Sequence, residues 1–336
     1  MTTEFAPAWW LPGPNLQTLW GKFLRRRANI QTHVERLSTP DGDFLDLHHL
    51  PGRLGEPLLV LLHGLEGSIR SHYIQGLLTE ASRRHWRAAV LVFRSCGNEV
   101  NRTKRFYHSG ETTDLAFAIG HLVASFRDSP IVLAGVSLGG NVLLKYLGEQ
   151  GDRISPRIRA AAAVSVPYDL GRAADHIDRG FAKVYQQSFI NSLKAKAIAK
   201  LDAFPGLLRL SDVESIRTIR DFDNRVTAPI HGFKNAADYY KRSSSLGWID
   251  RVHLPTLLMS AVDDPFLPPQ VLELVRSLAK QNPSLQVEFS ETGGHAGFVA
   301  GMNPFHPHYY MERRVGDFLA DQLNRSELAI QNGGRP

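Results

Sequence analysis

Short apolar runs of strand length alternate along the chain with longer stretches that carry apolar residues every three or four positions. This alternation is typical of β-α-β units, in which helices cover both faces of a mostly parallel sheet. Several runs are apolar at nearly every position, as expected of strands buried on both faces. The predicted parallel strands are residues 57–62, 88–93, 131–136, 159–166, 256–261 and 285–290.

An antiparallel hairpin is predicted to precede these strands at one edge of the sheet. Its strands, 31–37 and 44–50, flank Pro40-Asp41-Gly42-Asp43, and these residue types favour a tight turn. The sheet therefore has about eight strands. The helices predicted between them from their apolar spacing are residues 71–85, 112–126, 138–149, 269–280 and 309–323.

The alternation stops over residues 169–247, which contain helical stretches but no convincing strand. We interpret this segment as a helical cap inserted into an α/β core, which comprises residues 31–168 and 248–325. Residues 1–30 form an N-terminal arm. Residues 326–336 are polar and end in Asn-Gly-Gly-Arg-Pro, so we expect a flexible tail.

The sequence Gly135-Val136-Ser137-Leu138-Gly139 directly follows a predicted buried strand and directly precedes a predicted helix. A G-x-S-x-G motif in this position is typical of a sharp strand-to-helix turn that exposes a nucleophilic serine. Side chains at Gly135 and Gly139 would collide in such a turn. We therefore expect Ser137 to be a nucleophile at the carboxyl end of the sheet, facing the positive end of the following helix.

A serine nucleophile needs a base and an acid that orients the base. His295 follows the last predicted strand, and Asp264 follows the strand before it in the run Asp-Pro-Phe-Leu-Pro. The chain order serine, aspartate, histidine is the order found in α/β-hydrolases. Asp263 and Asp169 are alternatives for the acid, although we expect Asp263 to cap the turn or to bond backbone.

The oxyanion that forms during acyl transfer needs two backbone donors. The amide of Leu138 directly follows the nucleophile and is predicted to be the first donor. The second is predicted to be the amide of Leu65, in the loop His63-Gly64-Leu65-Glu66-Gly67 after a buried strand. We expect His63 to order this loop through hydrogen bonds.

No other chemistry leaves a comparable pattern. The chain lacks an H-E-x-x-H motif, a P-loop and a G-x-G-x-x-G turn, and its one cysteine, Cys96, cannot form an internal disulfide. The histidines at 48–49 and at 306 and 308 have no carboxylate or further histidine spaced to complete a metal site, so we expect them on the surface. We predict no metal and no cofactor.

The N-terminal arm is basic and aromatic. It holds three of the five tryptophans, Trp9, Trp10 and Trp20, and a basic run at 22–27, and it contributes half of the formal net charge of +6. One hypothesis is peripheral contact with a membrane surface. We favour an arm packed on the cap or core with its arginines in solvent, because three prolines interrupt any long amphipathic helix.

Nucleic-acid binding is not expected, since no recognised motif accompanies the positive charge. The chain has no apolar run of about 18 residues and no signal-like N-terminus, so we expect a cytoplasmic protein. The sequence does not predict an oligomeric state.

The chain resembles the YheT-like esterases of the α/β-hydrolase superfamily, which are related to lipid-acting abhydrolase-domain proteins of eukaryotes. The resemblance spans nearly the whole chain. It rests on the motifs at residues 12–18, 63–68, 107–112 with 114, 135–141 and 263–266. It implies that Ser137 is the nucleophile, Asp264 the acid and His295 the base, and that the substrate is an ester of small-molecule or lipid-like type.

Residues 93–102 depart from the family pattern, in which Arg-Gly-Cys-Ser-Gly-Glu-Pro is usual. Here Ser95 replaces a glycine and Val100 replaces a proline, which leaves the shape of this loop open. The expected activity is hydrolysis of carboxylic esters through an acyl-enzyme. Thioester hydrolysis or acyl transfer by the same residues, and ligand binding without catalysis, are the alternatives.

Overall fold

The computed structural model describes residues 4–25, 28 and 30–331 of the chain. Its centre is an eight-stranded sheet with the order β1-β2-β4-β3-β5-β6-β7-β8. The first two strands form an antiparallel hairpin, β2 is also antiparallel to β4, and all other pairs are parallel. The strands are β1 (His33–Ser38), β2 (Phe44–Leu50), β3 (Leu58–Leu62), β4 (Arg87–Val92), β5 (Ile131–Val136), β6 (Ile158–Val164), β7 (Thr256–Ala261) and β8 (Leu285–Ser290). The predicted mostly parallel sheet is confirmed.

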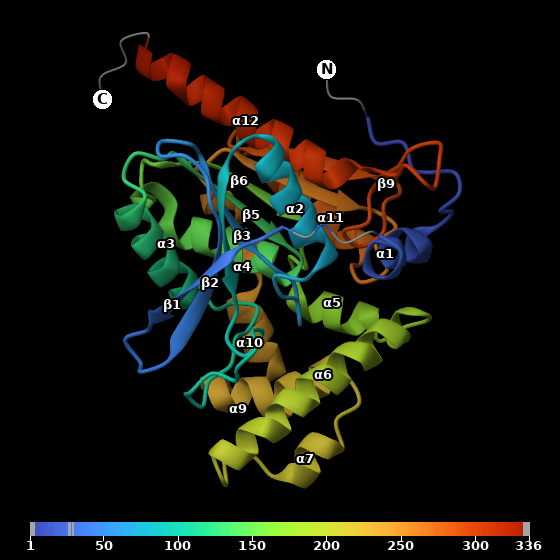
Figure 1. Cartoon of the computed structure of the whole chain (residues 1–336). Helices are drawn as coiled ribbons and strands as arrows, with labels where there is room; N and C mark the ends of the chain where they lie inside the picture. The colour runs from blue at the N-terminus through green and yellow to red at the C-terminus, as the bar shows by residue number, and fades with distance from the viewer. Residues whose placement is uncertain (1–3, 26–27, 29, 332–336) are drawn as a thin grey trace.

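Helices cover both faces of this sheet (Figure 1). Along β5, Ile131 and Leu133 join a core with α3 and α4, whereas Val132 and Ala134 join a second core with α2 and α12. This separation follows from the two-residue period of a strand and explains why the run is apolar throughout. The covering helices are α2 (His72–Arg83), α3 (Thr113–Ser125), α4 (Leu138–Gln150), α11 (Pro269–Ala279) and α12 (Tyr310–Gln331), with short 3₁₀ segments at Gly151–Arg153 and Ser245–Arg251.

The pairing of β3 with β5 positions the residues of interest. Leu62 at the end of β3 is opposite Gly135 near the end of β5, although the two are far apart in the sequence. The loop after β3 therefore lies beside the turn that carries Ser137. This juxtaposition depends on strand order, which the hydrophobic pattern does not specify.

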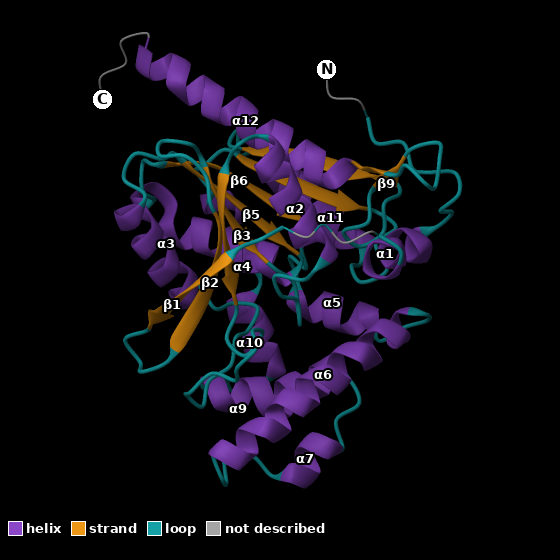
Figure 2. Cartoon of the chain, viewed as in Figure 1, coloured by secondary structure: helices purple, strands orange, loops and turns teal. Residues whose placement is uncertain are grey.

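The segment between β6 and β7 forms a layer of helices on one side of the sheet, seen below the strands in Figure 2. It contains no strand, and its apolar residues Ile190, Val213 and Val226 form a separate small core. Its helices are α5 (Leu170–Ile177), α6 (Ala182–Ala203), α7 (Leu210–Glu214), α8 (Ile219–Phe222), α9 (Ala228–His231) and α10 (Ala236–Ser243), with a π-helical turn at Asp223–Thr227.

The N-terminal arm packs on the core through a short helix, α1 (Pro14–Phe23), that begins at the last of its prolines. The rings of Trp10 and Trp20 contact each other at a centroid distance of 4.6 Å. The guanidinium of Arg25 pairs with Glu312 and lies over a tyrosine ring. The expectation of solvated arginines is thus wrong for Arg25, because a buried carboxylate of α12 lies within its reach; the other two arginines are outside the described residues.

The C-terminal helix is longer than predicted. Helix α12 continues to Gln331, so residues 326–331 of the expected flexible tail are helical. This stretch contains neither glycine nor proline, and the helix-disfavouring Asn-Gly-Gly run begins only at 332, which lies outside the described residues. Within the described ranges, no helix combines the length and apolar character needed to cross a membrane.

Candidate active site

Ser137 lies in a strained turn between β5 and α4, with φ 57° and ψ −124°. A Cβ atom on Gly135 would lie 2.5 Å from the carbonyl oxygen of Gly139, and a Cβ on Gly139 would lie 2.6 Å from the carbonyl oxygens of Leu62 and His63. These neighbours are backbone atoms and cannot rotate away. The glycines at both positions are therefore required by the turn, as the motif predicts.

His295 and Asp264 come from two different loops and meet at the carboxyl end of the sheet. The Nδ1 atom of His295 lies 2.8 Å from Oδ2 of Asp264, and both side chains are buried. The other carboxylate oxygen of Asp264 accepts a hydrogen bond of 2.8 Å from the amide of Phe266, whose ring packs on His295. Because Nδ1 faces the carboxylate, Nε2 is the nitrogen that can exchange a proton with a substrate or nucleophile.

Ser137 and His295 line the same two cavities. Among the described residues, no hydrogen bond joins the Ser137 hydroxyl to His295. Such a bond is often long without substrate and shortens when substrate binds. The site therefore holds a serine together with a hydrogen-bonded histidine–aspartate pair.

The two alternative acids have other partners. Oδ1 of Asp263 accepts a hydrogen bond of 2.9 Å from the amide of Gly294, which matches its expected backbone role, and burial raises the pKa of Asp263. Asp169 caps α5 by accepting a hydrogen bond from the amide of Arg172. Asp264 is the acid that contacts His295.

The loop after β3 approaches the serine closely. A Cβ on Gly64 would lie 3.1 Å from the Cβ of Ser137, and the amide of Gly64 is already bonded to the hydroxyl of Tyr73. The next amide, that of Leu65, makes no hydrogen bond to any described group. Leu138 begins α4, so its amide has no partner within the helix. Neither amide therefore has a hydrogen-bond partner among the described residues.

His63 holds this loop in place. Its Nδ1 lies 2.8 Å from the carbonyl oxygen of Gly64, and its Nε2 accepts a hydrogen bond of 3.1 Å from the amide of Phe93. Burial lowers the pKa of His63 to about 4, so the ring is neutral near pH 7 and donates through Nδ1. The expected ordering role of His63 is confirmed.

Glu66, the residue after Leu65 in the loop that follows β3, connects this loop to α6. Glu66, with φ 54°, accepts hydrogen bonds from the hydroxyl of Tyr107 and from Nζ of Lys196, each at 2.8 Å. Lys196 also lies 3.3 Å from the sulfur of Cys96. Burial raises the pKa of Cys96 to about 11, which keeps the thiol protonated and unreactive near neutral pH.

Two residues of α1 hold the loop that carries His295, and the sequence interpretation assigned them no role. The side chain of Gln17 donates to the carbonyl of Val299 and accepts from its amide. The hydroxyl of Thr18 accepts a hydrogen bond of 2.9 Å from the amide of His295. The only sequence signal was their membership in the motif at 12–18.

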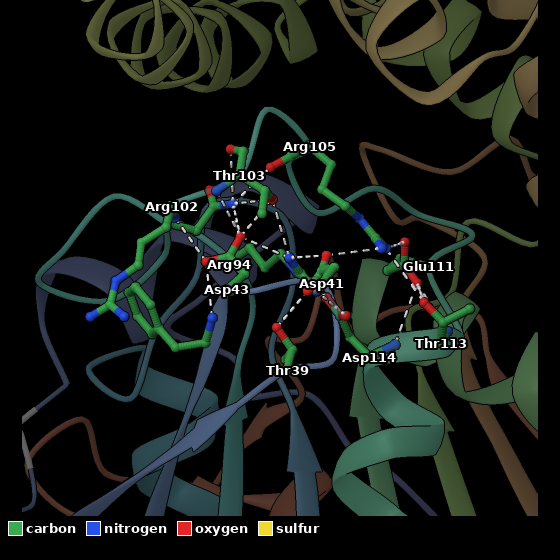
Figure 3. Close-up of polar contacts among 12 residues, drawn as sticks. Thr39, Asp41, Asp43, Arg94, Arg102, Thr103, Arg105, Glu111, Thr113 and Asp114 are labelled. Carbon is green, nitrogen blue, oxygen red and sulfur yellow. Dashed lines mark hydrogen bonds and ion pairs between the residues drawn. The ribbon is translucent and has the colours of Figure 1, made fainter. Parts of the chain in front are cut away.

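The loop that departs from the family pattern is held by a buried ion-pair network (Figure 3). Arg94 donates to both carboxylate oxygens of Asp114 at 2.7 Å and to Asp43 at 2.8 Å. Ser95 has φ 63°, a conformation that favours glycine, and its hydroxyl compensates by bonding Asn101. The glycine-to-serine change is therefore accommodated within the loop.

Two cavities meet at Ser137. The larger has a volume of about 630 Å³ and lies between α1, α6 and the loop after β3, with Lys22, Tyr185 and Phe266 among its lining residues. The smaller, of about 100 Å³, is lined largely by apolar side chains such as Leu170 and Ile177.

No group of three or more histidine, cysteine, aspartate or glutamate side chains in the described ranges is arranged to hold a metal ion. The expectation of surface histidines is wrong for His49. It is buried because its ring stacks on those of His33 and Phe126, and it bonds Glu35 at 2.8 Å.

A family model and several sequence relatives assign the chain to the same protein family. Residues 57–301 match the family model described as alpha/beta hydrolase fold. The chain is 39% identical over 327 residues to the Escherichia coli (strain K12) protein named "Putative esterase YheT", an alignment that covers 96% of this chain and 94% of that protein. It is 27% identical to Phospholipase ABHD3 of Homo sapiens, over 95% of this chain and 79% of the relative.

Among solved structures, the Pyrococcus furiosus esterase Pf2001 superimposes with a TM-score of 0.56 over 88% of this chain and 98% of that structure. At 16% sequence identity, this similarity concerns the fold alone.

A further sequence relative is the Monoacylglycerol lipase of Saccharomyces cerevisiae, to which the chain is 30% identical over 72% of this chain and 55% of that protein.

Proposed function

Because the chain belongs to the alpha/beta hydrolase family, within the branch that contains YheT, we propose that it is a serine hydrolase of carboxylic esters. The observation that carries the proposal is the meeting of Ser137 with the His295–Asp264 pair in one cavity. Relatives named as an esterase, a lipase and a phospholipase support ester chemistry.

In the proposed reaction, Nε2 of His295 accepts the hydroxyl proton of Ser137 as Oγ attacks the ester carbonyl carbon. Asp264 holds the ring through Nδ1 and stabilises the imidazolium. The amides of Leu65 and Leu138 donate to the oxyanion of the tetrahedral intermediate, where preorganised donors lower the barrier.

Collapse of the intermediate breaks the ester bond, and His295 returns the proton to the departing alcohol. The acyl group is then bound to Ser137 as an ester. Water then attacks the acyl carbon while His295 takes one of its protons. The second tetrahedral intermediate breaks its bond to Oγ of Ser137, which recovers the proton from His295 as the carboxylic acid leaves. The apolar cavity beside Leu138 suits the acyl group, and the larger cavity suits the alcohol part of a small-molecule or lipid-like ester.

Labelling with a fluorophosphonate probe tests the proposal directly, since the probe modifies only an activated serine. The wild-type chain should be labelled and should hydrolyse short p-nitrophenyl esters, whereas Ser137→Ala should do neither. A folded wild-type chain that resists labelling would instead support ligand binding without catalysis. Faster turnover of matched thioesters would redirect the proposal to thioester hydrolysis.

A further inference from the structure

Helix α1 has an unusual distribution of side chains for a surface helix. Its inner face, which contacts the His295 loop, consists of Gln17, Thr18 and Gly21, all of which are buried. Leu16 and Phe23 of this helix are exposed to solvent, as is Leu24, which directly follows the helix. A surface helix normally buries its apolar residues and exposes its polar ones. Here the polar face packs against the chain, whereas Leu16, Phe23 and Leu24 remain largely exposed.

A second exposed apolar pair lies next to this helix. The hydroxyl of Tyr185, near the start of α6, donates a hydrogen bond of 3.0 Å to Asn15 of α1. Figure 1 shows α1 above the α5–α6 part of the chain, at the right of the view. Phe181 and Val184 shortly precede Tyr185 in the sequence and are exposed.

We call these exposed residues the apolar rim. Its members, Leu16, Phe23, Leu24, Phe181 and Val184, have between 46% and 67% of their surface exposed. Both helices that carry the rim also line the larger active-site cavity, α1 through Leu19 and Lys22 and α6 through Tyr185 and Phe189. The rim therefore lies on, or directly next to, the two helices that line this cavity.

Positive charge surrounds the rim. Lys22 and Arg70 line the cavity and are exposed, and Arg179 and Lys183 alternate with the apolar residues at the start of α6. None of these four side chains forms an ion pair with a described residue. Exposed apolar side chains beside unpaired cations are typical of surfaces that bind anionic lipid. A second copy of this chain fits less well, because pairing two rims would bring like charges together.

We propose that the apolar rim docks on an anionic lipid surface and turns the mouth of the active-site cavity toward it. The rim side chains enter the boundary between head groups and acyl chains, while the four cations contact anionic head groups. A lipid-like ester could then pass from the surface to Ser137 without crossing water. This role in substrate delivery rests on the proposed function, whereas the docking itself does not.

Vesicle sedimentation of the full chain tests the docking. The wild type should pellet with vesicles of phosphatidylcholine and phosphatidylglycerol, and far less with phosphatidylcholine alone. Replacing Phe23 and Leu24 with serine should weaken binding about tenfold or more. Lys183→Glu, at an exposed cation that does not line the cavity, should weaken it about fivefold or more, and added salt should reduce wild-type binding.

A matched control uses apolar residues that are also more than half exposed but lie near the β1–β2 edge of the sheet. Leu54 and Val34, which are 86% and 55% exposed, line a different cavity, and serine at both positions should leave binding unchanged. Hydrolysis of a water-soluble p-nitrophenyl ester should be retained in every variant, which shows that the site is folded.

Three results would overturn the docking. In the first, the wild type hydrolyses soluble esters but does not bind anionic vesicles. In the second, the control pair loses as much binding as the Phe23 and Leu24 variant. In the third, the wild type is a dimer in solution and the Phe23 and Leu24 substitutions dissociate it. If vesicles bind but no ester is cleaved, the proposed function fails and the docking stands.

Discussion

The hydroxyl of Thr18 in α1 accepts a hydrogen bond of 2.9 Å from the backbone amide of His295, 277 residues away in the chain. The same hydroxyl donates to the carbonyl of Pro14, so both its donor and its acceptor capacity are used. A Cβ on Gly294 would lie 2.5 Å from that carbonyl oxygen, which shows how closely α1 abuts the loop. Thr18 is thus a positioning residue for the proposed base.

Thr18→Val keeps the shape of the side chain but removes the acceptor for the His295 amide. We expect kcat to fall about tenfold to a hundredfold with little change in KM, because small displacements of a general base are costly. Thr18→Ser restores the hydroxyl and should recover most of the activity. Steady-state kinetics over a range of pH measure the effect; a uniform loss in both variants would indicate a structural role only.

The contact between Asp264 and His295 predicts unequal effects for neighbouring acids. Asp264→Asn removes the carboxylate that stabilises the imidazolium and should lower kcat by about three to four orders of magnitude. Asp263→Asn changes a side chain that bonds the amide of Gly294, and it should reduce activity far less. If both variants kept comparable activity on p-nitrophenyl esters, Asp264 would not be the acid.

Two glycine substitutions separate a crowded site from an open one. Gly139→Ala places a Cβ 2.6 Å from two backbone carbonyl oxygens and should destabilise the chain by about 3 kcal/mol and abolish serine labelling. A Cβ on Gly120, within α3, would meet no heavy atom within 4 Å beyond the backbone of its own helix. Gly120→Ala should therefore raise the free energy of unfolding by about 0.5–1 kcal/mol. Urea denaturation measures both values.

The ion-pair network of Figure 3 predicts how the free energy of unfolding changes as the pH falls. Burial alone would raise the pKa of Asp43, but hydrogen bonds from Asn101 and Thr103 outweigh it and hold the pKa well below its ordinary value. The folded state therefore binds this proton less readily than the unfolded chain, and the contribution is lost as pH falls below about 4.

Asp43→Asn leaves the guanidinium of Arg94 with one buried partner fewer and should lower the free energy of unfolding by about 3 kcal/mol near neutral pH. The gap between variant and wild type should narrow at about pH 3, as wild-type Asp43 begins to lose its advantage. Denaturation at both pH values tests this sign; a gap that widens in acid would contradict the assigned pKa direction.

The sequence by itself determined the order of strands and helices along the chain and the positions of the proposed catalytic residues in loops after strands. These features are local: a two-residue period predicts a strand, and glycines at 135 and 139 predict a turn too tight for side chains. The same local reasoning predicted that the last helix ends at residue 323, which is too early. Residues 324–331 contain no glycine or proline to end the helix, and α12 continues to Gln331.

Only the tertiary structure decided which distant side chains meet. Hydrogen bonds between Thr18 and His295, or between Arg94 and Asp114, depend on strand order and on packing between segments that the hydrophobic pattern does not pair. The arm shows the difference most clearly. Its three tryptophans suggested a membrane contact, yet Trp10 and Trp20 pack together and only Trp9 of the three is largely exposed. Phe23 and Leu24 also face solvent, because the polar face of α1 holds the His295 loop.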